Sequence, residues 1–258
     1  MVNTNPVIGL CLPEWVLPRD PFAPGFVTIA HPVPDPVQLS TSAPTLSPPE
    51  VHLLTADSIT CIRDRRVVVS LARLTLAEGE CIELRGANGS GKTTLLRALC
   101  GLLPCEGKVQ CHVRIAFVGH RNGNAGLLTP IENLRWHRQL QDAPVDDEQL
   151  LDALARVGLL RAAGKPVQQL SQGQQRRLAL ARLLLSDAKV WLLDEPHAAL
   201  DVAASALLDE LLNTHCQEGG AVLVSSHAPL AVATRVIDLS TDDLSADHRS
   251  ADSAQAAA

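Results

Sequence analysis

The sequence predicts an α/β fold with a mixed core sheet, an antiparallel β subdomain and an inserted helical subdomain. Three observations predict it. Short apolar segments typical of strands alternate with helix-forming segments between residues 80 and 225. Two longer strand-like segments at residues 53–76 precede them, and two helix-forming segments separate two of the core strands. Strands alternating with helices favour an α/β fold.

Composition narrows the class of protein. With 258 residues the chain can bury one sizeable core. Its 22 basic and 28 acidic residues give no electrostatic footprint for nucleic acid. No apolar run approaches the roughly 18 residues of a membrane span, and Pro13 and Glu14 interrupt the most apolar N-terminal stretch. We therefore expect neither a direct membrane span nor a signal peptide.

The seven cysteines are scattered and form no C-x-x-C pair. That pattern suits a reducing compartment, where cysteines act as small apolar residues. The nearest approach to a metal cluster has a spacing that matches no common zinc or iron–sulfur pattern; it comprises Cys100, Cys105, Cys111 and His112.

Three regions are expected along the chain. Residues 1–50 hold most of the 17 prolines and few charges, and we expect a disordered extension without chemistry. Residues 51–240 form the folded domain, with the helical subdomain at about 127–186. The polar, alanine-rich tail at 241–258 is expected to be disordered.

The folded domain opens with two strands at residues 53–61 and 67–76, which we expect to pair antiparallel around the charged turn Arg63-Asp64-Arg65-Arg66. A short alternating strand at residues 80–85 follows, and a helix at 94–100 comes after a glycine-rich turn. That turn reads G-x-x-x-x-G-K-T, the spacing of a phosphate-binding loop (the P-loop).

A strand, a glycine-rich turn and a helix aim backbone N–H groups and a helix N-terminus at phosphate. The alternative interpretation, a glycine-rich β–α turn with an incidental lysine, is disfavoured because both the residue spacing and the flanking strand and helix match a P-loop. Lys92 is expected to reach the β- and γ-phosphates, and the Thr93 hydroxyl to bind Mg²⁺. The residues assigned to phosphate are Gly86, Ala87, Asn88, Gly89, Ser90, Gly91, Lys92, Thr93 and Thr94. The chain therefore binds a nucleoside triphosphate.

The middle of the chain predicts a turn at residues 101–108, a core strand at 113–119 and a polar loop at 120–126. Thr129, Pro130 and Glu132 then form the capping box that begins a helix reaching about residue 141. A second helix at 147–157 carries one apolar stripe, made of Leu150, Leu151, Leu154 and Val157.

Three segments toward the C-terminus carry chemistry. Residues 170–174 (LSQGQ, the signature segment) open a helix to about residue 186, with Ser171 as its N-cap and a second anion site behind it. The apolar strand at 190–193 ends in Asp194 and Glu195, where carboxylates belong at the ligand edge of a parallel sheet. Asp194 fits a role in holding Mg²⁺ through water, and Glu195 can polarise an attacking water.

Residues 199–201 lead into a helix at 202–215, and a buried strand at 221–225 follows. His227 comes just after that strand. A lone histidine there is usually a surface residue, but its place at the same sheet edge as Glu195 favours a functional role.

Taken in order, the P-loop, the loop at His120, the signature segment, VWLLDEP with ALD, and SSH resemble the ATP-binding-cassette (ABC) ATPases over residues 55–239. The resemblance implies a P-loop NTPase fold of ABC-ATPase type, with ATP and Mg²⁺ as ligands. It also implies a head-to-tail homodimer, in which the signature segment of one subunit faces the P-loop of the other. By position, Glu195 would be the catalytic carboxylate, His227 the γ-phosphate switch, and Lys92 a further catalytic residue. Cross-dimer contacts would come from Ser171, Gly173, Gln174 and Asp201.

Two positions depart from that family. His120 stands where the family places a glutamine that ligates Mg²⁺, which weakens that assignment. Arg63 falls near the position of the adenine-stacking aromatic residue, and the chain has no tyrosine. Either a guanidinium face stacks on the base, or stacking is weak.

Within the family, the chain most resembles the ATP-binding subunit of the haem exporter of cytochrome c maturation. The similar segments are Gly119-His120, LLTPIENL, LSQGQQRRLALARL, DEPHAALD and SSHAPL; Arg121 departs from the subfamily's Gly-His-Gln. This resemblance implies a peripheral protein on the cytoplasmic face of the inner membrane, paired with an integral membrane subunit. The alternatives are an ATPase for another small-molecule exporter and a soluble ATPase of iron–sulfur assembly. A translation or DNA ATPase and a cassette that hydrolyses ATP poorly fit less well.

Overall fold

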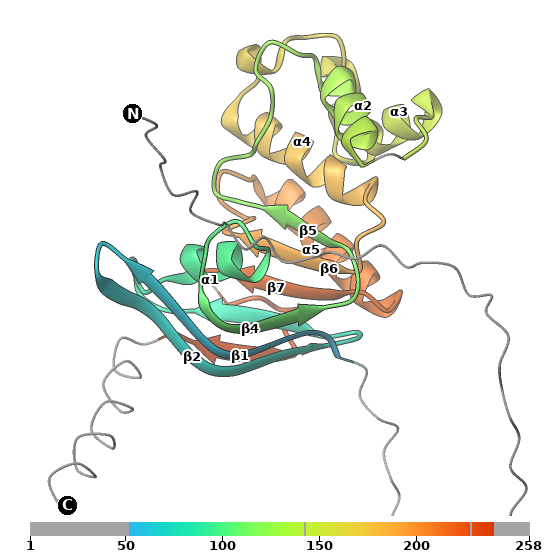
Figure 1. The fold of residues 1–258 in the computed structure, drawn as a ribbon. Coiled ribbons are helices and arrows are strands. Elements are labelled where there is room, and N and C mark those ends of the chain that lie inside the picture. The colour runs from blue at the N-terminus through green and yellow to red at the C-terminus, as the bar shows by residue number, and fades with distance from the viewer. Residues whose placement is uncertain (1–51, 142, 228, 240–258) are drawn as a thin grey trace, which may run out of the picture. The chain divides into compact units, whose positions relative to one another are not determined.

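The computed structural model describes residues 52–141, 143–227 and 229–239 (Figure 1). The expectations for residues 1–50 and 241–258 lie outside this part of the chain. Among the described residues, no helix has the length and apolar character that crossing a bilayer requires.

A three-stranded antiparallel sheet has the order β2-β1-β4, with β1 at His52–Arg63, β2 at Arg66–Ala77 and β4 at Glu106–Cys111. The turn between β1 and β2 consists of Asp64 and Arg65, whose φ angles are 50° and 62°. Two positive φ angles are typical of a type I′ turn, whose twist matches that of the strands it joins. This hairpin was expected, and it is slightly longer at both ends.

A second sheet of five strands has the order β5-β6-β7-β3-β8. Its strands are β5 (Ile115–Val118), β6 (Val190–Asp194), β7 (Ala221–Ser225), β3 (Cys81–Arg85) and β8 (Arg235–Asp238). All the described pairings in it are parallel. The antiparallel pairing expected of a mixed core sheet is therefore confined to the three-stranded sheet. Because the strands are parallel, β3, β5, β6 and β7 deliver the loops that follow them to one edge.

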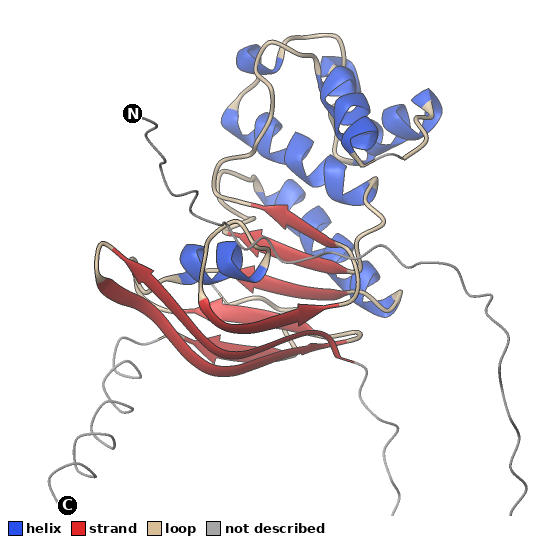
Figure 2. Cartoon of the chain, in the orientation of Figure 1, coloured by secondary structure: helices blue, strands red, loops and turns tan. Residues whose placement is uncertain are grey.

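Helices cover both faces of the core sheet, as Figure 2 shows. α1 (Lys92–Leu99) lies between the two sheets, and its Leu95 and Leu96 share a buried cluster with Leu192 of β6. α5 (Val202–Gln217) lies on the opposite face, where Leu208 packs in a second cluster with Trp191. Alternate residues of β6 thus serve both clusters, which explains why this strand is apolar throughout.

The remaining helices follow β5 and gather beyond it (Figure 1). They are α2 (Pro130–Leu140), α3 (Asp147–Arg156) and α4 (Gln172–Leu184), with 3₁₀ turns at Leu160–Ala162 and Val167–Gln169. Thr129 caps α2 with the expected capping box, in which the Glu132 side chain accepts from the Thr129 amide at 2.7 Å.

Three local predictions need correction, and one strand was not predicted. The turn expected at residues 101–108 ends early, because β4 begins at Glu106. The strand expected at residues 113–119 is shorter, at Ile115–Val118. Leu151, placed on the buried stripe of α3, is 40% exposed, whereas Leu150 and Leu154 are buried. Finally, β8 was not predicted.

Candidate nucleotide-binding site

The P-loop, residues 86–93, lies at the edge of the core sheet between β3 and α1. Gly86 and Gly91 have φ angles of 143° and 97°, which disfavour a side chain. A Cβ on Gly91 would lie 2.5 Å from Cγ2 of Val69, so glycine there also admits the close approach of β2. The loop conformation therefore depends on its glycines.

Lys92 is held across this loop. Its side chain is buried, and Nζ donates to the carbonyl oxygens of Gly86 at 2.6 Å and Ala87 at 3.1 Å. The two carbonyls aim the ammonium group at the centre of the loop. Ser90 is also buried, and its hydroxyl has no hydrogen-bond partner among the described residues.

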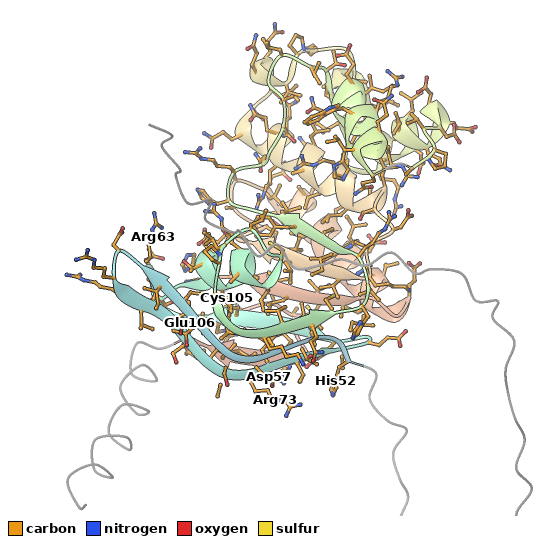
Figure 3. All side chains as sticks on the ribbon, in the orientation of Figure 1. His52, Asp57, Arg63, Arg73, Cys105 and Glu106 are labelled. Atoms are coloured by element: carbon orange, nitrogen blue, oxygen red, sulfur yellow. The ribbon has the colours of Figure 1, made fainter. Side chains whose placement is uncertain are left out.

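A pocket of about 530 Å³ opens above the loop. It brings together several predicted residues from distant parts of the chain. Its lining consists of Arg63, Val68, Asn88, Gly89, Gly91, Lys92, Thr93, Thr94, His120, Glu195 and His227. Arg63, the residue aligned with the adenine-stacking position, lies at the turn end of β1, where Figure 3 labels it.

Asp194, at the end of β6, is 1% exposed and accepts hydrogen bonds from two hydroxyl groups. The Thr93 hydroxyl lies 2.9 Å from Oδ2 and 3.1 Å from Oδ1 of Asp194, and the Ser225 hydroxyl donates to Oδ1 at 2.8 Å. A hydroxyl beside a carboxylate supplies the hard oxygen ligands that Mg²⁺ prefers, so these residues fit the ion.

Glu195 follows immediately and has a φ of 49°, which is unusual for a residue other than glycine. Its amide donates to the hydroxyl of Ser225 at 3.0 Å and to the Ser225 carbonyl at 3.1 Å. Its carboxylate is flanked by two histidines: His227 Nε2 lies 2.8 Å from Oε1, and His120 Nδ1 lies 4.0 Å from Oε2. The Glu195 carboxylate is therefore in contact with His227 at the lining of the pocket.

Sequence reasoning did not assign a role to Ser225, although it ends a fully buried strand. Its hydroxyl donates to the Asp194 carboxylate and accepts from the Glu195 amide, so it links the Asp194 side chain to the backbone of Glu195. The available signal was a polar residue at the carboxyl end of an apolar strand, next to the strand that carries the carboxylates.

The signature segment does not line the pocket that holds Lys92. Ser171 caps α4 through a capping box, in which its hydroxyl accepts from the Gln174 amide at 3.2 Å and its own amide donates to Gln174 Oε1 at 2.9 Å. A Cβ on Gly173 would lie 2.8 Å from the Ala199 carbonyl oxygen, so this glycine also permits a close approach.

Asp201 also lies outside the pocket. It caps α5, accepting from the Ala204 amide at 2.8 Å. Among the described residues, no group of three or more histidine, cysteine or acidic side chains is arranged to hold a metal ion.

Comparison with known proteins places this geometry in a family. Residues 69–198 match the model of the ABC transporter family. The cytochrome c biogenesis ATP-binding export protein CcmA of Vibrio cholerae is 40% identical over 188 residues, which cover 68% of this chain and 91% of that protein. The protein of the same name from Methylococcus capsulatus is 43% identical over 192 residues, covering 69% of this chain and 93% of that protein.

A solved structure described as a dimeric bacterial ABC transporter cassette is 25% identical, with a TM-score of 0.67. The similarity covers 72% of this chain and 94% of that one. The P-loop pocket, the matched family model and these relatives agree. The chain belongs to the ABC transporter family, as an ATP-binding cassette.

Proposed function

We propose that the chain is the ATP-hydrolysing subunit of an exporter that moves or releases haem during c-type cytochrome biogenesis. The observation that carries the proposal is the position of the Glu195 carboxylate. It lines the P-loop pocket together with Lys92, and its Oε1 lies at hydrogen-bond distance, 2.8 Å, from His227 Nε2. This arrangement suits in-line attack of water on a bound triphosphate.

Each residue has a separate task in that reaction. Glu195 polarises the attacking water, whose oxygen forms the new bond to the γ-phosphorus while the bond to the ADP oxygen breaks. Lys92 supplies positive charge to the β- and γ-phosphates, exchanging its two carbonyl partners for phosphate oxygens. His227 orients Glu195 and can donate to the γ-phosphate.

Thr93 and Asp194 would hold Mg²⁺, because their oxygens already lie together at 2.9 Å. When bound, the ion neutralises charge that develops on the β- and γ-phosphate oxygens. His120 stays a weaker candidate for a metal ligand, because its charged neighbour at 4.0 Å is Glu195.

A homodimer completes the site. Ser171, Gly173 and Gln174 lie at the N-terminus of α4, outside the pocket of their own chain. A helix N-terminus attracts anions, so this segment can serve the triphosphate of a second copy. The dimeric ABC transporter cassette among the similar solved structures supports this arrangement.

Two observations support haem as the cargo and a membrane subunit as the partner: the names of the similar proteins, and sequence segments that resemble one subfamily. The relatives are named as cytochrome c biogenesis ATP-binding export proteins. The segments SSHAPL and LSQGQQRRLALARL resemble that subfamily. We infer a peripheral position at the cytoplasmic face of the inner membrane, on an integral haem-exporter subunit.

The test is to purify tagged Glu195→Gln protein with ATP from gently solubilised membranes of its own cell and identify what accompanies it. Recovery of a haem-export membrane subunit is the expected result. Recovery of another permease would keep the ATPase and contradict the haem cargo. A chain found only in the soluble fraction, with cofactor-assembly factors, would contradict the transport function.

A further inference from the structure

Arg176 of α4 has a buried side chain with a complete set of hydrogen-bond partners. It is 3% exposed. A guanidinium group has five N–H donors, and each of them reaches a separate acceptor. Nε donates to Pro196 O at 3.1 Å, Nη1 to Gly119 O at 2.8 Å and Asn122 Oδ1 at 3.0 Å, and Nη2 to Asp194 O at 2.8 Å and Glu195 O at 2.7 Å.

These acceptors come from two loops of the nucleotide site. Gly119 and Asn122 flank His120 in the loop after β5. The other acceptors are three consecutive carbonyls, from the last residue of β6 and the two residues that follow it. Three consecutive carbonyls cannot face one cation in an extended strand, where they alternate in direction. The left-handed φ of Glu195, 49°, turns the chain so that they do. Arg176 therefore stabilises the strained conformation from which the Glu195 carboxylate projects.

The charge of Arg176 fits this role. Burial lowers the pKa of the guanidinium, and the nearby carboxylates of Asp194 and Glu195 oppose that effect. A buried cation is tolerated when its hydrogen bonds are complete and opposite charge is near. Such a group resists any movement that would leave one of its donors unpaired.

We propose that Arg176 is a positioning residue for ATP hydrolysis, which ties the backbone of Glu195 and the His120 loop to the helix that begins at Ser171. The inference rests on the proposed role of Glu195 as the catalytic carboxylate. It makes α4 the link between the phosphate contact expected at its N-terminus and the carboxylate that activates water. A displacement of the α4 N-terminus moves the Glu195 backbone through Arg176.

Geometry matters more than charge in this role. Lysine keeps the positive charge but has only three donors on one nitrogen. It cannot span acceptors on two loops as the planar guanidinium does. Arg176→Lys should therefore lower kcat nearly as much as Arg176→Gln.

The experiment measures kcat, KM and the affinity for a non-hydrolysable ATP analogue in the full-length chain. Rates are counted per chain that binds the analogue, so unfolded protein does not contribute. We expect kcat of Arg176→Lys and Arg176→Gln to fall about a hundredfold, with little change in analogue affinity. The matched control is Arg177→Gln, because Arg177 is the next residue on α4 and, within the described part of the chain, its side chain donates only to Val157 O, at 3.3 Å. It should keep normal kcat.

Normal kcat in Arg176→Lys, or an equal loss in Arg177→Gln, would overturn the proposal. A loss of analogue affinity with kcat unchanged would also overturn it, because that result indicates damage to binding alone. Glu195→Gln is measured in parallel. If it hydrolyses ATP normally, the proposed function fails. If it is inactive while Arg176→Lys is normal, only the present inference fails.

Discussion

At the scale of single residues, Lys92 illustrates how a charged group is held ready for its ligand. Its ammonium bonds two P-loop carbonyls, and these bonds fix the direction of the side chain. Phosphate oxygens carry full negative charge and are stronger acceptors than carbonyls. The lysine is therefore positioned in advance.

Lys92→Ala should weaken ATP binding about ten- to a hundredfold, because it removes a charge-assisted hydrogen bond to phosphate. Equilibrium binding of a fluorescent ATP analogue measures the change. Lys108→Ala is the control, since Lys108 is exposed on β4. Unchanged affinity in Lys92→Ala would show that the P-loop is not the nucleotide site.

Arg63 is a second residue whose individual role can be tested. It lines the pocket and aligns with the position expected to stack on the base. A guanidinium plane stacks on aromatic faces. Arg63→Ala should weaken ATP binding about two- to fivefold, whereas Arg65→Ala, at the hairpin turn, should not. Competition binding of ATP against inorganic triphosphate separates the base contribution. Equal affinities of the two variants would contradict stacking by Arg63.

Most chemistry-bearing residues of the pocket could be predicted from sequence, because motif spacing fixes their local context. Lys92, Thr93, Glu195 and His227 line it or bond within it as expected. Ser225 and Arg176 could not be predicted, because their roles consist of hydrogen bonds to residues distant in the chain. A local sequence pattern does not show which distant residues a side chain will bond to.

At the scale of elements, capping fixes where the signature helix begins. Ser171 and Gln174 satisfy one another's backbone N–H groups at the start of α4, as Thr129 and Glu132 do at the start of α2. Both capping boxes stabilise a helix end. Only the capping box of α4, at Ser171, is proposed to contact phosphate.

Ser171→Asp separates those two roles. Aspartate is as good an N-cap as serine, so the thermal stability should be retained, but its negative charge repels the triphosphate of the partner and hydrolysis should be lost. Thr129→Ala provides the reverse case: unfolding free energy falls by about 1 kcal/mol, while the rate per folded chain is kept. Thermal denaturation and phosphate release measure the two properties. Full activity in Ser171→Asp would contradict the phosphate contact.

The elements missed by sequence analysis are edge strands. β4 contains Glu106, Gly107 and Lys108, all exposed, and such residues are typical of turns. Pairing with β1 makes it a strand, and that pairing is not encoded locally. β8 is only four residues long and lies at one edge of the five-stranded core sheet, beside β3. The central strands were predictable because burial on both faces demands continuous apolar sequence.

At the scale of the whole molecule, the two halves of the proposed catalytic site face different partners. The P-loop, Asp194 and Glu195 gather at one pocket, whereas Ser171 and Asp201 lie outside it. On the proposed arrangement, a single chain binds ATP without the contact expected from the signature segment. We propose that dimerisation driven by ATP supplies that contact, and that hydrolysis then removes the γ-phosphate that both copies would hold.

The most direct test of this account is to measure ATP-dependent dimerisation and phosphate release side by side in Glu195→Gln. Replacing the carboxylate leaves the phosphate contacts intact, so ATP should convert the variant into a stable dimer seen by sedimentation, with turnover reduced by at least about a hundredfold. Glu210→Gln, on the exposed side of α5, should behave as the unaltered chain. Normal phosphate release by Glu195→Gln would contradict the catalytic role of Glu195, and its failure to dimerise with ATP bound would contradict a site shared between two copies.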